Sequence, residues 1–147
     1  VGDKPQVVPV SVLEAFLTTY ETARSNFGGD TLLQPGTPLF ESGAAVGAVA
    51  SDMARSIPGD AWTGTASDAY AEANNENTTK MRAFAALDKR LGSQIDAAAY
   101  SVSRGRQDLV TVHDQVTSLA DSVPPGPLRE VMLMPIVAAG MGQIGDA

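Results

Sequence analysis

The sequence predicts an all-α protein, a helical bundle built on an elongated antiparallel hairpin. Alanine contributes 22 of the 147 residues whereas aromatic residues make up only 5%, which suits closely packed helices better than a β-sandwich. No proline occurs between Pro58 and Pro124, so a long helix has room there. Within that interval, apolar residues recur at alternating spacings of four and three, which is typical of a helix packed along another helix.

Two helices are expected before Pro58. The first, over residues 12–26, follows a capping box in which the Ser11 side chain and Glu14 bond each other's backbone N–H groups. The second, over residues 38–57, has Thr37 as its predicted N-cap and Pro38 at its first helical position.

The third helix, residues 66–122, is the longest, and a second capping box at Thr65–Asp68 opens it. Small residues in its seam, Ala98 and Gly105, should let a neighbouring helix approach closely. The distal half should therefore pair with an antiparallel helix of this chain or offer its seam to another chain. The seam consists of Leu91, Ile95, Ala98, Val102, Gly105, Leu109, Val112, Val116 and Leu119.

A fourth helix is expected over residues 127–142, rich in methionine and uncharged beyond Glu130. This helix is shorter than the roughly 20 residues that a membrane span needs. Contact of the helix with a membrane surface stays open as an alternative. We expect the first and fourth helices to pack along the distal half of the third, within a single helical domain over residues 1–147. A start at Val1 and an end at Ala147 indicate a piece of a longer protein.

Composition argues against an enzyme. The chain has no cysteine and one histidine, His113, which removes disulfides, thiolate catalysis and the common zinc sites. Residues 140–145 match G-x-G-x-x-G, but the dinucleotide fingerprint needs a preceding strand, and small-residue helix packing explains these glycines better. We therefore predict no catalytic residue, no cofactor and no metal site. A net charge of −7 with dispersed cations also excludes non-specific nucleic-acid binding.

The single tryptophan, Trp62, lies in the turn between the second and third helices, where Gly64 lets the backbone turn. Two interpretations stay open. Trp62 is either a hydrophobic plug wedged between the two helices or part of an interaction module.

The residues around this turn carry a family resemblance. The fourteen residues from Ile57 to Tyr70, Ile-Pro-Gly-Asp-Ala-Trp-Thr-Gly-Thr-Ala-Ser-Asp-Ala-Tyr, resemble a stretch of the mycobacterial EspA/EspE family, which is associated with type VII (ESX) secretion. The likeness includes Leu-Asp-Lys-Arg-Leu at residues 87–91 and covers the chain from about Gly28 to its end. The helix, Trp-x-Gly turn and second helix also resemble WXG-type secretion substrates. The implied turn motif is Pro58, Gly59, Asp60, Trp62, Gly64 and Tyr70.

The resemblance implies a non-enzymatic helical hairpin exported by, or assisting, a type VII apparatus, and thus secreted or associated with the cell envelope. Its partner would be another helical secretion-associated protein, a second copy of itself, or a component of the apparatus. The Tyr-x-x-x-Asp/Glu export signal of such substrates is not matched, because Arg24, Asn74 and Arg104 stand four residues after the three tyrosines. Either a partner supplies the signal or the protein is a non-exported relative. The alternative function is a cytoplasmic scaffolding coiled coil unrelated to secretion.

Overall fold

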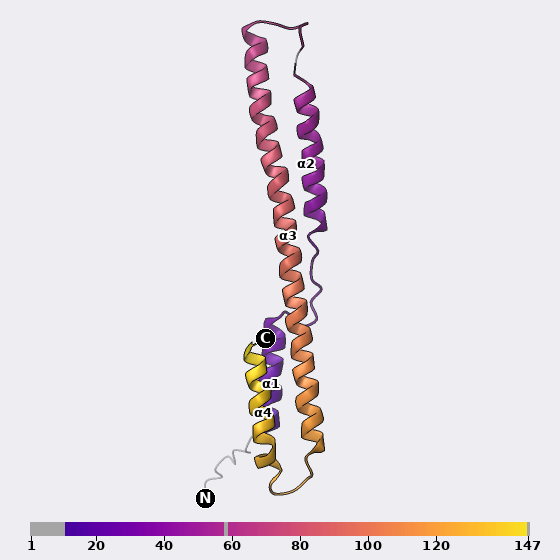
Figure 1. The fold of residues 1–147 in the computed structure, drawn as a ribbon, viewed down its shortest axis with the longest axis vertical. Coiled ribbons are helices and arrows are strands. Elements are labelled where there is room, and N and C mark those ends of the chain that lie inside the picture. Colours follow the sequence, from indigo (N-terminus) through magenta and orange to yellow (C-terminus); the bar gives the residue numbers. More distant parts are fainter. Residues whose placement is uncertain (1–10, 58, 147) are drawn as a thin grey trace, which may run out of the picture. The chain divides into compact units, whose positions relative to one another are not determined.

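The computed structural model describes residues 11–57 and 59–146, and within them it has four helices and no strand (Figure 1). These are α1 (Val12–Asn26), α2 (Thr37–Arg55), α3 (Thr65–Ser122) and α4 (Arg129–Asp146). The all-α prediction is therefore confirmed. The chain divides into two compact units. The bundle unit contains α1, α4 and the part of α3 from Ser101 onward, and the hairpin unit runs from Leu33 to Tyr100.

The helix bounds differ slightly from those predicted. The N-cap of α2 is Gly36, not Thr37, so this helix begins one residue earlier than expected, and it ends at Arg55. The start of α3 at Thr65 places that residue inside the helix instead of at its cap. A turn in which Arg129 N–H donates to the Gly126 carbonyl shifts the start of α4 to Arg129. That all these helices form one domain stays a prediction.

In the bundle unit, large aliphatic and aromatic side chains form the core. Phe16 of α1, Val116 of α3 and Val137 of α4 lie in one buried cluster, and Leu133 of α4 lies in a second. The predicted capping box of α1 is present, with Glu14 N–H 3.1 Å from Ser11 Oγ and Ser11 N–H 3.0 Å from the Glu14 carboxylate. These contacts fix where α1 begins.

Two glycines of the bundle unit lie directly under aromatic rings. The ring of Phe27, the C-cap residue of α1, occupies the space that a Cβ atom at Gly105 would need. Val116 and Phe16 fill the corresponding space at Gly140. Since Gly140 and the rest of the G-x-G-x-x-G match lie inside α4, these residues form helix and not a phosphate-binding loop.

In the hairpin unit, small residues bring α2 and α3 into backbone contact. A Cβ atom at Gly43 of α2 would lie only 2.8 Å from the Ala85 carbonyl oxygen of α3. At Gly36, such an atom would overlap the Gly92 backbone. Ala50, on the same face of α2 as Gly43, is fully buried. At Gly43 and Gly36 this interface has no room for a side chain on α2.

Polar side chains complete the hairpin interface by bonding across it. The Asn74 Nδ2 group donates to the Met53 carbonyl oxygen at 2.6 Å, in the last turn of α2. Ser42 Oγ donates to Asp88 at 2.8 Å, and the Asp96 carboxylate accepts from Gly36 N–H at 2.7 Å. These bonds fix the register of α2 on α3.

The close approach at Gly43 can be tested with a matched pair of substitutions. Gly43→Ala should lower the free energy of unfolding by about 1–2 kcal/mol, because the added methyl group overpacks against the Ala85 carbonyl. Gly47→Ala, one turn later in α2, places its methyl group 3.9 Å from Ala85 Cβ, an ordinary contact. It should raise the free energy of unfolding by up to about 1 kcal/mol through helix propensity. Urea denaturation followed by circular dichroism measures both, and equal effects would contradict the proposed contact.

The cross-helix bond of Asn74 can be tested against its neighbour Asn75. Asn74→Ala should cost about 1–2 kcal/mol of unfolding free energy, because it removes a bond from a buried side chain to a helix-terminal carbonyl. Asn75 is exposed, so Asn75→Ala should be neutral or slightly stabilising. Thermal unfolding of both variants gives the comparison. An Asn74→Ala protein as stable as the Asn75→Ala protein would show that the bond contributes nothing.

Candidate protein-binding surface

The turn between α2 and α3 is held by hydrogen bonds to its own backbone. Trp62 N–H donates to the Gly59 carbonyl at 3.2 Å, and Ser67 Oγ donates to the Trp62 carbonyl at 2.7 Å. Gly64 has a φ of 107°, a conformation that favours glycine, and its carbonyl accepts from Asp68 N–H in the first turn of α3. The Trp62 backbone is thus fixed on both sides.

The Trp62 side chain lies on the surface, so the plug interpretation is wrong. It is 45% exposed and contacts the Tyr70 ring, with 5.5 Å between ring centroids, and Tyr70 is itself 42% exposed. The physical reason lies in the hairpin interface. Because glycine and alanine bring the two helices into backbone contact, no space for an indole remains between them.

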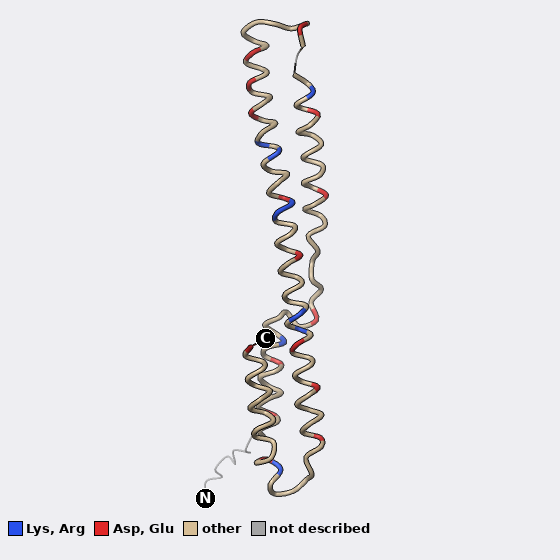
Figure 2. Tube along the Cα trace, viewed as in Figure 1, with Lys and Arg blue, Asp and Glu red and all other residues tan. Residues whose placement is uncertain are grey.

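The other residues of the predicted motif lie around this aromatic pair. Gly59 and Asp60 are exposed in the turn, with Gly59 serving as the acceptor for Trp62. Pro58 lies outside the described residues. The exposed rings of Trp62 in the turn and Tyr70 in α3 thus belong to a part of the chain in which the charged residues are acidic (Figure 2).

The predicted seam of α3 behaves differently in the two units. In the bundle unit it is covered: Gly105, Leu109, Val112 and Val116 are buried and Val102 is half-buried. Leu119, however, is 52% exposed. In the hairpin unit Ile95 is half-buried, whereas Leu91 and Ala98 are exposed. Of the two alternatives, packing within the chain therefore does not hold for these three exposed residues, and their packing against another chain stays a prediction.

In the hairpin unit the seam residues Leu91 and Ala98 stay exposed because α2 packs on another face of α3. The α2-facing residues are small or polar, so a search for periodic hydrophobic residues does not find them. The residues that the structure buries there are Ser67, Asn74, Thr78, Ala85 and Gly92.

Two exposed apolar residues in the hairpin unit were missed by the sequence analysis. Phe84 is 61% exposed and Leu87 is 57% exposed. Phe84 stands seven residues before Leu91, as Leu91 stands seven before Ala98. Extending the heptad spacing upstream would have found it.

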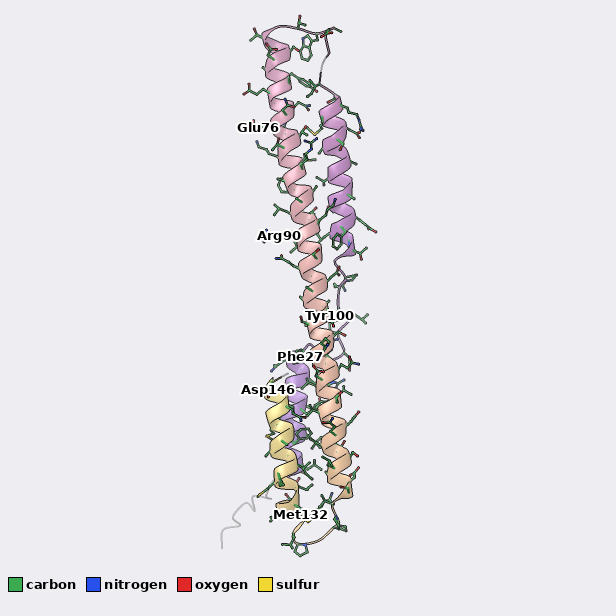
Figure 3. All side chains as sticks on the ribbon, viewed as in Figure 1. Phe27, Glu76, Arg90, Tyr100, Met132 and Asp146 are labelled. Atoms are coloured by element: carbon green, nitrogen blue, oxygen red, sulfur yellow. The ribbon has the colours of Figure 1, made fainter. Side chains whose placement is uncertain are left out.

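Apolar side chains are also exposed on α4 and just before it. Leu128, Val131, Met132 and Met134 are all more than half exposed, and Met132 is labelled in Figure 3. Among the helices of residues 11–57 and 59–146, none has the length and apolarity needed to cross a membrane.

The first turns of α3 carry only acidic charges, and cations appear further along the helix. Its first turns carry Asp68, Glu72 and Glu76, and cations follow from Lys80 onward. Lys80 forms an ion pair with Glu76 at 2.6 Å, and this hydrogen-bonded ammonium lowers the pKa of the Glu76 carboxyl from its usual value.

The titratable side chains of the described segments do not gather into a metal site. No group of three or more His, Asp or Glu side chains suited to a metal ion occurs among those residues. His113 lies against the Tyr20 ring, with centroids 4.6 Å apart, and its Nδ1 is 3.1 Å from the neighbouring Asp114. The candidate site is the set of exposed aromatic and aliphatic side chains at the turn and on α3.

The chain was compared with protein-family models, curated proteins and solved structures. No curated protein and no solved structure matches the chain. The model of the EspA/EspE family matches residues 29–111, which is more than half of the chain and contains the whole hairpin unit with its Trp62 turn. The chain belongs to the EspA/EspE family.

Proposed function

We propose that this chain is a non-enzymatic, secretion-associated interaction module that binds a helical partner protein through its Trp62 turn. The observation that carries this proposal is the exposed Trp62–Tyr70 pair, which lies inside the family match on a turn fixed by hydrogen bonds. Large aromatic side chains on a rigid backbone are typical anchors of protein interfaces, since they bury much area at little entropic cost.

The partner would also supply the export signal. Asn74 stands where the signal after Tyr70 would need Asp or Glu, and its side chain is committed to the Met53 carbonyl in the hairpin interface. A carboxylate there would lose this donated bond. Export of a pair by a type VII apparatus would place the protein outside the cell or at its envelope. The partner would be another helical secretion-associated protein or a component of the apparatus, and the exposed apolar side chains of α4 would serve for contact with a membrane surface.

A scaffolding role unrelated to secretion is the second candidate. The observation in its favour is the heptad seam of α3, which the bundle unit buries as a coiled coil does. The family match across the hairpin unit favours the secretion-associated role instead.

Substitution of Trp62 should separate folding from function. Trp62→Ala should cost only about 1 kcal/mol of unfolding free energy, since it removes one exposed ring contact. We expect a loss of more than tenfold in the amount exported to culture filtrate by a host that carries a type VII apparatus, because an interface anchor is removed.

The matched control is Tyr100→Ala, which removes another exposed aromatic side chain, 65% exposed, away from the turn. It should leave export unchanged. A host strain without the apparatus gives the background. Export of the Trp62→Ala protein at the wild-type level, or export that does not depend on the apparatus, would refute the proposed function.

A further inference from the structure

The hairpin unit has a second exposed feature, an apolar stripe on α3 formed by Phe84, Leu87 and Leu91. All three side chains are about half exposed or more. We propose that this stripe, the apolar stripe, is the docking site for an amphipathic helix of a partner whose apolar face is bordered by acidic residues. The proposal rests on the proposed function and deepens it by stating where the partner helix lies and what chemistry it has.

The stripe lies on a face of α3 that α2 does not cover. Each of its residues directly precedes a residue of the α2-facing line, namely Ala85, Asp88 and Gly92. One residue corresponds to a rotation of about 100° around a helix, so the stripe is turned away from α2 by that angle. α2 therefore leaves it uncovered.

The stripe continues the heptad register of an interface that the chain already uses. Phe84, Leu91, Ala98, Gly105 and Val112 follow one another at intervals of seven residues. In the bundle unit, Gly105 and Val112 of this register are buried against other elements of the chain. A register that packs against helices at one end and continues with larger apolar residues at the other is typical of an incompletely occupied coiled-coil seam.

The charges beside the stripe decide which occupant fits. Residues 80–90 carry four cations against one carboxylate. Lys80 is paired with Glu76 and the Lys89 side chain lies against Gly43 of α2, whereas Arg90 lies beside the stripe. Arg90 borders Leu87 and Leu91 in a shallow surface pocket and projects from α3 on the side away from α2 (Figure 3). Among the described residues no carboxylate lies within ion-pair distance of Arg90. An acidic residue flanking the partner's apolar face would pair with it.

A second copy of this chain fits less well. Two copies joined through Leu87 would place the cation-rich segment of one copy against the same segment of the other, whether the helices ran parallel or antiparallel. Like charges across an interface disfavour association. Charge complementarity therefore selects a different, acidic helix.

A designed peptide can test the site without knowledge of the natural partner. The probe is a three-heptad helical peptide with leucine at its core positions and glutamate at the flanking positions, and its control has lysine in place of every glutamate. By fluorescence anisotropy, the glutamate peptide should bind at least about tenfold more tightly than the lysine peptide. The difference should shrink as salt is added.

Two matched pairs of substitutions locate the binding. Leu87→Ser should weaken binding of the glutamate peptide about tenfold, whereas Val110→Ser, at a residue 49% exposed in the bundle unit, should not. Arg90→Glu should weaken binding several-fold, whereas Arg82→Glu, which changes the net charge equally on another face of α3, should not. Circular dichroism checks that all four variants fold.

The following outcomes would overturn the proposal. Equal binding of the two peptides, or binding that Leu87→Ser leaves unchanged, would exclude the site. Sedimentation showing a dimer that Leu87→Ser dissociates would identify a second copy as the occupant instead. Because Trp62 lies outside the stripe, Trp62→Ala should leave peptide binding intact. Failure here therefore differs from failure of the proposed function, which appears as Trp62-independent export.

Discussion

The backbone contact between α2 and α3 is the constraint on which the hairpin unit depends. Gly43 lies against the Ala85 carbonyl, and Gly36 lies against Gly92, so the two helices approach more closely than large side chains would permit. Burial of small residues releases little hydrophobic free energy per residue. Cross-helix hydrogen bonds such as that from Asn74 to Met53 add stability and fix the register at the same time.

This constraint determines what the surface contains. Since the backbone contact at Gly43 and Gly36 leaves little room between the helices, the large side chains of Trp62, Phe84 and Leu87 lie outside it. The bundle unit follows the opposite rule. There Phe16, Leu109 and Leu133 are the fully buried large side chains, and glycines such as Gly105 only make room for a ring. One continuous helix, α3, thus takes part in two kinds of interface, one built on small residues and one on large apolar side chains.

The sequence predicted the helices well because their ends are determined locally. The capping box at Ser11 and the proline-free interval need only neighbouring residues to act. The face of α3 that meets α2 could not be predicted in this way, since hydrophobic periodicity marks Leu91 while the actual contact uses Asp88 and Gly92. The plug interpretation rested on the position of a lone tryptophan between two helices, and the backbone contact at Gly43 that leaves no space for its ring became visible only in the structure. The motif around Trp62 came from family resemblance, whereas exposure of the neighbouring stripe required the structure.

Several polar side chains of the described residues hold backbone groups in place. Asn74, Ser67 and Arg106 each bond a carbonyl oxygen, and the Asp96 carboxylate accepts a backbone N–H. Side chains used in this way stabilise turns and helix ends and are not free to act on a ligand. What the hairpin unit has left to offer another molecule is apolar and aromatic surface with charge at its borders. Surface of that composition is suited to contact with other proteins through shape and complementary charge, which supports the binding role proposed for this EspA/EspE family member.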